Sequence, residues 1–124
     1  MTTEKVIHRE LSESIIGAAM KVLNTHKPGL TERAYENALV VELTKRGHTV
    51  QQQRRFEVRY EGILVDSFVP DLIVEDAVIA DTNVVSQYDT HIAQMIGYLA
   101  ITDLHLALLL NFKHKDLRWK RVVR

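Results

Sequence analysis

Apolar residues recur at three- and four-residue spacing in the first third of the chain, and this spacing predicts two amphipathic helices. The first helix is expected to span residues 4–26 and to end before Pro28 and Gly29. The second begins at Thr31, a favourable N-cap residue, and ends at Gly47. The expected buried positions of the second helix are Ala34, Ala38, Leu39, Val41 and Leu43.

After Gly47 apolar and polar residues alternate, which is typical of strands with one buried face. Strands are predicted at residues 50–60, 63–74 and 78–85, and Pro70 suggests a sheet edge or a bulge within the second. A loop at 86–89 leads to a third helix at 90–102, with Asp89 or Thr90 as its N-cap. The apolar run at 104–112 predicts a central strand covered on both faces, and 117–123 predicts a last, exposed strand.

This order of elements, ααβββαββ, indicates an α/β fold in which helices flank a mixed sheet of about five strands. A length of 124 residues predicts one domain spanning residues 1–124. The absence of cysteine excludes a disulfide framework and a thiolate zinc site. No apolar run reaches the roughly 18 residues that span a bilayer and no signal peptide is recognisable, so we expect a soluble, cytoplasmic protein without a membrane partner.

Two aspartates stand inside apolar runs on either side of a turn around Asp76. If the flanking strands pair as a hairpin centred there, Asp71 faces Asp81. Facing like charges destabilise a sheet unless a cation lies between them, and a divalent metal is the natural candidate because it binds carboxylate oxygens. The alternative is a pair of aspartates that simply lie near a turn at the end of the sheet.

Other polar side chains are expected near this pair. Glu32 and Glu36 share one face of the second helix, beside Tyr35, although an acidic first turn is also favoured by the helix dipole. Asn83 shares the strand face of Asp81. His91, Gln94 and Tyr98 form one stripe of the third helix, and periodicity alone favours a solvent-facing side for this stripe.

The chain carries 16 basic and 16 acidic residues, so its overall field does not attract nucleic acid and any polyanion must bind a local patch. One candidate patch is Arg54, Arg55 and Arg59. The alternative is that these residues form a solvated face. A second basic group lies in the tail: Lys113, Lys115, Arg118, Lys120, Arg121 and Arg124.

Four motifs together resemble a known family. The segment from Gly29 through Glu32 to Tyr35 is similar to the Gly-x-x-Glu-x-x-Tyr signature of the GxxExxY family, a branch of the PD-(D/E)XK nuclease superfamily with a restriction-endonuclease-like core. Pro70-Asp71 and Asp81-x-Asn83 resemble its second and third motifs. Gln94 to Tyr98 is similar to the Gln-x-x-x-Tyr motif of RecB-type relatives.

The resemblance implies a metal-dependent phosphodiesterase that acts on nucleic acid. It implies that Asp71, Asp81, the backbone carbonyl of Thr82 and either Glu36 or Glu32 hold one or two Mg²⁺ (or Mn²⁺) ions. The ions would activate the attacking water. It further implies that Gln94, Tyr98 and His91 brace the site or contact the substrate, with Tyr35 in support.

The chain departs from the family pattern at Asn83, where a lysine is expected. An amide carries no charge and cannot help to deprotonate water, and losing one electrostatic stabiliser costs about 10²–10³ in rate. Three interpretations stay open: an active nuclease, with Lys113 or Lys115 as a candidate replacement; an inactive nucleic-acid-binding or self-assembling module; or a laboratory substitution at position 83. The last strand, with Trp119, Val122 and Val123, offers an edge for a homodimer or higher homo-oligomer.

Overall fold

The computed structural model describes residues 8–86 and 89–124, without the side chains of residues 89 and 90. Its elements, in chain order, are α1 (Arg9–His26), α2 (Glu32–Lys45), β1 (Val50–Gln52), β2 (Phe56–Tyr60), β3 (Ile63–Phe68), β4 (Leu72–Val74), β5 (Val78–Asn83), α3 (Asp89–Thr102), β6 (Leu106–Asn111) and β7 (Arg118–Val123). Part of the first predicted helix, residues 4–7, and the predicted N-cap side chains of the third helix lie outside this description.

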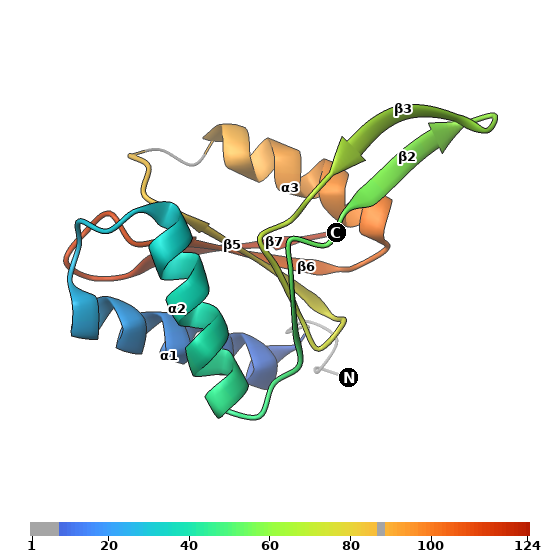
Figure 1. Cartoon of the computed structure of the whole chain (residues 1–124). Coiled ribbons are helices and arrows are strands. Elements are labelled where there is room, and N and C mark those ends of the chain that lie inside the picture. Colours follow the sequence, from blue (N-terminus) through green and yellow to red (C-terminus); the bar gives the residue numbers. More distant parts are fainter. Residues whose placement is uncertain (1–7, 87–88) are drawn as a thin grey trace.

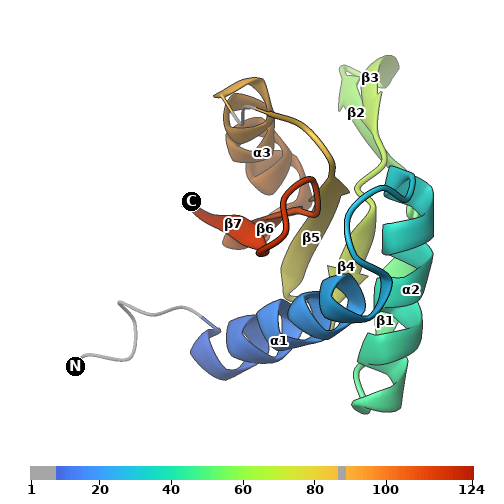
Figure 2. The same ribbon diagram turned by 90° about the vertical axis from the view of Figure 1, so that its left-hand side faces the viewer.

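Five strands form one mixed sheet in the order β1-β4-β5-β6-β7. β5 and β6 run parallel, and every other neighbouring pair is antiparallel. α1 and α2 cover one face of the sheet, and α3 covers the other (Figures 1 and 2). The predicted α/β class, with five strands flanked by helices, is therefore confirmed.

Two of the predicted strands are wrong in their extent, because each is broken in the middle. Residues 50–60 divide into β1 and β2, and residues 63–74 divide into β3 and β4. The breaks fall at Gln53, which has a φ of 58°, and around Pro70, which cannot donate to a sheet ladder. The N–H of Gln53 donates to the carbonyl of Asp71 at 3.0 Å. The two segments therefore leave the main sheet side by side, at neighbouring positions.

Beyond these breaks, β2 and β3 pair only with each other and form a two-stranded arm that projects from the body (Figure 1). Several large apolar side chains of this arm are exposed, among them Tyr60 (68%) and Ile63 (68%). We refer to residues 54–68 as the arm.

The start of the second helix is as predicted, but its buried face is narrower than the sequence pattern predicts. The Thr31 hydroxyl accepts a hydrogen bond from the N–H of Ala34 at 3.2 Å and caps α2. The apolar residues that α2 buries are Tyr35, Leu39 and Leu43, each four residues from the next. Val41 was expected in the core and is 60% exposed, because its position lies beyond the edge of that stripe.

The core is split by the sheet into two apolar layers. Even-numbered positions of β4, β5 and β6, such as Leu72, Ala80 and Leu108, face α1 and α2. Odd-numbered positions, such as Ile79 and Leu109, face α3. Since side chains alternate along a strand, the odd-numbered polar residues of these strands also belong to the α3 face.

β6 is buried along its whole length between β5 and β7, as predicted for a central strand. β7 lies at the edge of the sheet, where Trp119 is 43% and Val123 is 50% exposed. Val122 was expected on the open edge, but it is buried against α3. In the described part of the chain no helix is long and apolar enough to cross a membrane.

Tyr35 joins the α1–α2 turn to the core. Its hydroxyl donates to the carbonyl of Lys27 at 2.5 Å and accepts from the N–H of Leu30 at 3.1 Å. Its ring is fully buried and stacks on Phe112, with centroids 4.6 Å apart. The intervening Gly29 has a φ of 121°, which favours glycine. The tyrosine of the Gly-x-x-Glu-x-x-Tyr segment thus positions the start of α2.

We predict that Tyr35→Phe lowers the free energy of unfolding by about 1–2 kcal/mol, because two part-buried hydrogen bonds to backbone groups are lost. Tyr60→Phe removes the same atom from a residue that is 68% exposed and should change stability by less than about 0.5 kcal/mol. Urea unfolding of both variants measures the difference. Equal stability of the two variants would contradict this role for Tyr35.

Candidate functional site

Two carboxylates meet where the β4–β5 hairpin opens. The predicted hairpin register is confirmed by the pairing of Leu72 with Ala80, so that one residue further Asp71 stands opposite Asp81. The two carboxyl groups lie close enough for Asp71 to raise the pKa of Asp81, both by its charge and by hydrogen bonding. Asp71 Oδ2 also accepts from the N–H and the hydroxyl of Thr82, at 2.9 and 3.1 Å. The fold therefore holds both acids in fixed positions at one point.

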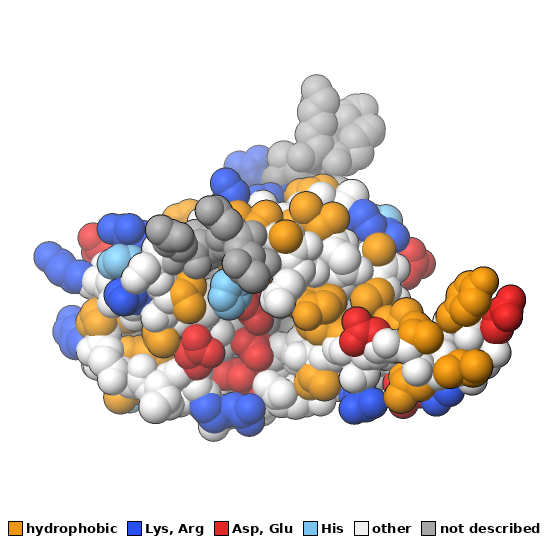
Figure 3. All heavy atoms as spheres, turned by 90° about the horizontal axis from the view of Figure 1, so that it is seen from above, with side chains coloured by type: hydrophobic (Ala, Val, Ile, Leu, Met, Phe, Trp, Pro, Cys, Tyr) orange, Lys and Arg blue, Asp and Glu red, His pale blue; other side chains and the backbone are white. Residues whose placement is uncertain are grey.

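The pair lines an open cavity of about 280 Å³ between the N-terminus of α2, the base of the arm and α3. Figure 3 shows acidic side chains gathered in a hollow beside a histidine. The sequence-predicted residues that line this cavity are Glu32, Asp71, Asp81, Thr82, His91, Gln94 and Tyr98. Glu36, Tyr35 and Asn83 do not line it.

Asp81 is the most perturbed acid of the site. Burial, followed by the charge of Asp71, raises its pKa from 3.8 to about 8. The hydrogen bond with Asp71 and the charges of Glu32 and Glu36 act in the same direction. His91 Nδ1 lies 3.8 Å from Asp81 Oδ2, too far for a hydrogen bond. Among the described residues Asp81 therefore has this one long ion-pair contact, with a group that is charged only when it is protonated.

The two glutamates of α2 have different surroundings. Glu36 is 3% exposed, and its Oε2 accepts hydrogen bonds from the side-chain amides of Gln52 at 2.7 Å and Gln53 at 2.9 Å. Arg33 lies 3.6 Å from its other oxygen. Glu32 lines the cavity, and its Oε1 accepts a longer bond, 3.3 Å, from the N–H of Val84. Glu36 is therefore held by Gln52 and Gln53, whereas Glu32 lines the same cavity as the two aspartates.

The polar stripe of α3 lies at the cavity, and Gln94 is also exposed to solvent. His91, Gln94 and Tyr98 all line the cavity, although periodicity alone favoured solvent. The Tyr98 ring stacks on Phe68, which stacks in turn on Phe56 of the arm. The arm is thereby anchored beside the acids.

Sequence reasoning missed the wall that the end of the arm and the next residue, Val69, contribute. Ser67, Phe68 and Val69 line the cavity, as does Met95 of α3. The only available signal was an aromatic residue two positions before Pro70, within a run that looked like one continuous strand.

Asn83 is buried, at 1% exposure, and both atoms of its amide lack a hydrogen-bond partner. Its neighbour across the parallel strands, Asn111, is equally buried but donates to the carbonyl of Val85 at 2.7 Å and accepts from the N–H of Lys113 at 3.0 Å. Neither Lys113 nor Lys115 lines the cavity. The position that resembles the family's lysine therefore supplies no charge to the site.

The three arginines predicted to bind nucleic acid are all paired with acids. Arg55 and Arg59 share Glu57, at 3.7 and 2.8 Å, and Arg54 lies 3.5 Å from Asp76. None of the three arginines lines the cavity.

The donor chemistry of the site suits a hard divalent cation, because carboxylate and carbonyl oxygens are its preferred ligands. The mutual repulsion of Asp71 and Asp81 is relieved by such an ion. In the described residues, however, no group of three or more His, Cys, Asp or Glu side chains is already placed to hold a metal ion. A third acidic ligand would have to turn toward the pair.

The raised pKa of Asp81 predicts a pH-dependent stability. Because the pKa of Asp81 is higher in the folded state than in the unfolded state, its protonation contributes to the free energy of unfolding. This stabilisation is complete below pH 3.8 and is lost as the pH rises toward about 8. Asp81→Asn removes the buried charge, so above about pH 8 its free energy of unfolding should exceed that of the parent by about 2–5 kcal/mol without added metal. Near pH 4 the two should be similar.

Urea unfolding across this pH range measures the difference. Asp103→Asn is a suitable control, because Arg124 holds the pKa of Asp103 below its ordinary value and the side chain is 89% exposed. The free energy of unfolding of this control should not exceed that of the parent at alkaline pH. A parallel gain in both variants would refute a specific effect at Asp81.

The two asparagines predict opposite responses to one substitution. Asn83→Leu removes an amide that has no partner, so stability should stay level or rise by about 1 kcal/mol. Asn111→Leu breaks two buried hydrogen bonds and should cost about 1–3 kcal/mol. Thermal unfolding of the two variants compares matched positions, and a larger loss at Asn83 would contradict the unpartnered amide.

Comparison with known proteins agrees with this geometry. No curated protein and no solved structure matches the chain. A family model of the PD-(D/E)XK nuclease superfamily matches residues 9–122, which include every residue assigned to the site above. The narrower assignment to the GxxExxY family stays a prediction. The match spans nearly the whole chain, and this protein therefore belongs to the PD-(D/E)XK nuclease superfamily.

Proposed function

We propose that this protein is a nuclease that hydrolyses phosphodiester bonds of nucleic acid with Mg²⁺ or Mn²⁺, and that residues 1–124 form its single domain. Membership of the superfamily supports the nuclease class and a nucleic-acid substrate. The observation that carries the proposal is the pair of facing aspartates in an open cavity, where burial and repulsion raise the pKa of Asp81 to about 8.

Asp71, Asp81 and the carbonyl of Thr82 would hold the metal ion, with Glu32 or Glu36 completing the set. A bound divalent ion supplies an activated water and polarises the phosphate. Glu32 is the better placed of the two glutamates because it lines the cavity, while Glu36 already accepts two amide hydrogen bonds. The buried Glu36 then fixes Gln52 and Gln53 beneath the site.

The α3 residues would orient the substrate. Gln94 presents an amide that can hydrogen-bond a phosphate oxygen, and Tyr98 is locked in place by its stacking on Phe68. His91, 32% exposed, is the basic side chain at the mouth of the cavity and can contact a phosphate there.

One observation favours the second candidate function, an inactive nucleic-acid-binding or self-assembling module. Asn83 is buried and does not line the cavity, so it gives the site neither a base nor a positive charge. This alternative predicts salt-sensitive nucleic-acid binding without metal-dependent cleavage.

Cleavage of labelled single- and double-stranded DNA and RNA with Mn²⁺ tests the proposal. The parent chain should cleave at least one substrate slowly, and EDTA should abolish the activity. Asp71→Ala should lower the rate by at least about 10²-fold, and Asn83→Lys should raise it by about 10²–10³-fold by restoring an electrostatic stabiliser. Glu13→Ala, a change at an exposed acid of α1 on the other side of the sheet, is the matched control and should leave the rate unchanged.

Mn²⁺ should also raise the melting temperature of the parent chain, and this shift should be absent in Asp71→Ala. If the parent chain and both site variants fail to cleave any substrate, the inactive module is the better description. Cleavage that survives Asp71→Ala would place the activity elsewhere or in a contaminant.

A further inference from the structure

The charges of the arm are balanced within the arm and its neighbours. Residues 54–66 contain Arg54, Arg55 and Arg59 together with three acids, Glu57, Glu61 and Asp66. The ion pairs with Glu57 and Asp76 engage all three guanidinium groups. A surface with this balance exerts little long-range attraction on a polyanion.

A different surface carries unbalanced positive charge. Lys113, Lys115, Arg118 and Lys120 are exposed on the β6–β7 loop and on β7, and we call these four residues the basic edge. Within the described part of the chain none of them forms an ion pair. The single acid in residues 112–124 is Asp116.

Strand register places the two β7 residues of this basic edge, Arg118 and Lys120, on the same face of the sheet as the acids. Arg118 pairs with Asn111, which in turn pairs with Asn83. Lys120 and Asp81 both pair with Leu109 from its two sides. Paired positions share a face, so Arg118 and Lys120 lie on the α3 face, two strands or about 10 Å across the sheet from β5.

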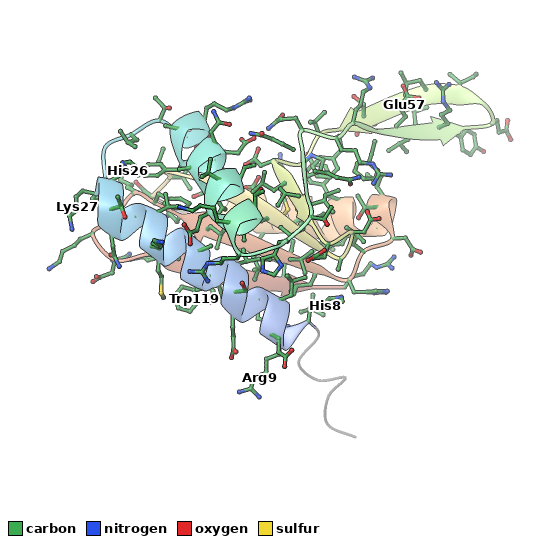
Figure 4. All side chains as sticks on the ribbon, turned by 60° about the horizontal axis from the view of Figure 1, so that its bottom comes forward. His8, Arg9, His26, Lys27, Glu57 and Trp119 are labelled. Atoms are coloured by element: carbon green, nitrogen blue, oxygen red, sulfur yellow. The ribbon has the colours of Figure 1, made fainter. Side chains whose placement is uncertain are left out.

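The loop that carries the lysines is fixed to the site by hydrogen bonds. The N–H of Phe112 donates to the carbonyl of Asn83 at 2.9 Å, and the side chain of Asn111 bonds both Val85 and the N–H of Lys113. The loop and the end of β5 lie at the same end of the molecule in Figure 1, and Lys and Arg side chains gather at that end in Figure 3. Figure 4 shows Glu57 of the arm well apart from Trp119 of β7.

We propose that the phosphodiester backbone of the substrate binds along the basic edge, and not along the arginines of the arm. Unpaired, exposed cations are the groups that bind phosphates and release counterions. A separation of about 10 Å between β5 and β7 corresponds to about three nucleotides of one strand. A strand that enters the cavity therefore reaches the basic edge within a few phosphates. The choice of nucleic acid as partner rests on the proposed function.

Fluorescence anisotropy with labelled single-stranded and duplex DNA, measured in EDTA, tests the proposal without requiring cleavage. The edge variant combines Lys113→Gln, Lys115→Gln and Arg118→Gln. The matched arm variant combines Arg54→Gln, Arg55→Gln and Arg59→Gln. The edge variant should bind at least about tenfold more weakly than the parent at low salt. The slope of the logarithm of its binding constant against the logarithm of the salt concentration should be smaller in magnitude by about 2. The arm variant should bind like the parent. Thermal unfolding checks that both variants are folded.

Three results would overturn the proposal: parent-like binding by the folded edge variant, a larger loss in the arm variant, or tighter binding to phosphatidylserine-containing vesicles than to either oligonucleotide. These results are independent of the cleavage assay. Cleavage by the parent chain together with unaffected binding by the edge variant would leave the nuclease function intact. Binding that depends on the basic edge, without any cleavage, would support the proposed binding surface and refute the proposed nuclease activity.

Discussion

The repulsion between Asp71 and Asp81 is the constraint on which the site depends. The hairpin register that buries Ile73 and Ile79 also places these two acids opposite each other, and a shift of one residue would turn the whole apolar set to the other face. The acids therefore cannot move apart without loss of the core. The fold itself holds two carboxyl groups at one partly buried point, and their proximity keeps Asp81 protonated below about pH 8 in the absence of a cation.

The rest of the structure positions other groups around that point. Tyr35 joins the start of α2 to Phe112 at the end of β6, which brings Glu32 to the cavity. Stacking of Phe68 on Tyr98 attaches the arm to α3 and closes another wall. These contacts are apolar and aromatic, and they supply the stability that an acid pair of this kind does not.

Much of the fold could be predicted from periodicity, because the apolar spacing of α1, α2 and β6 reports which positions are buried. The facing aspartates could also be predicted, since they follow from the register of one short hairpin. The breaks at Gln53 and Pro70 could not, because alternation continues across them and only the three-dimensional course of the chain shows that β2 and β3 leave the sheet. The same limit applies to the glutamates of α2 and to the arginines of the arm. A residue type suggests a chemical role, but neighbouring side chains decide whether its charge is free to bind a ligand, as Gln52 does for Glu36 and Glu57 does for Arg59.

Asn83 affects the site in two opposing ways. A lysine at this position, on the same strand face as Asp81, would add a positive charge beside the acid pair, and under the proposed function it would also help to activate water. Asparagine supplies neither, so under the proposed function the chain lacks this catalytic assistance, and residue 83 adds no positive charge to the acid pair. Burial makes such uncompensated charge costly, and an external cation is the direct way to relieve that cost. Under the proposed function, asparagine in place of the family's lysine should therefore both slow the reaction and make a divalent ion at Asp71 and Asp81 more important electrostatically.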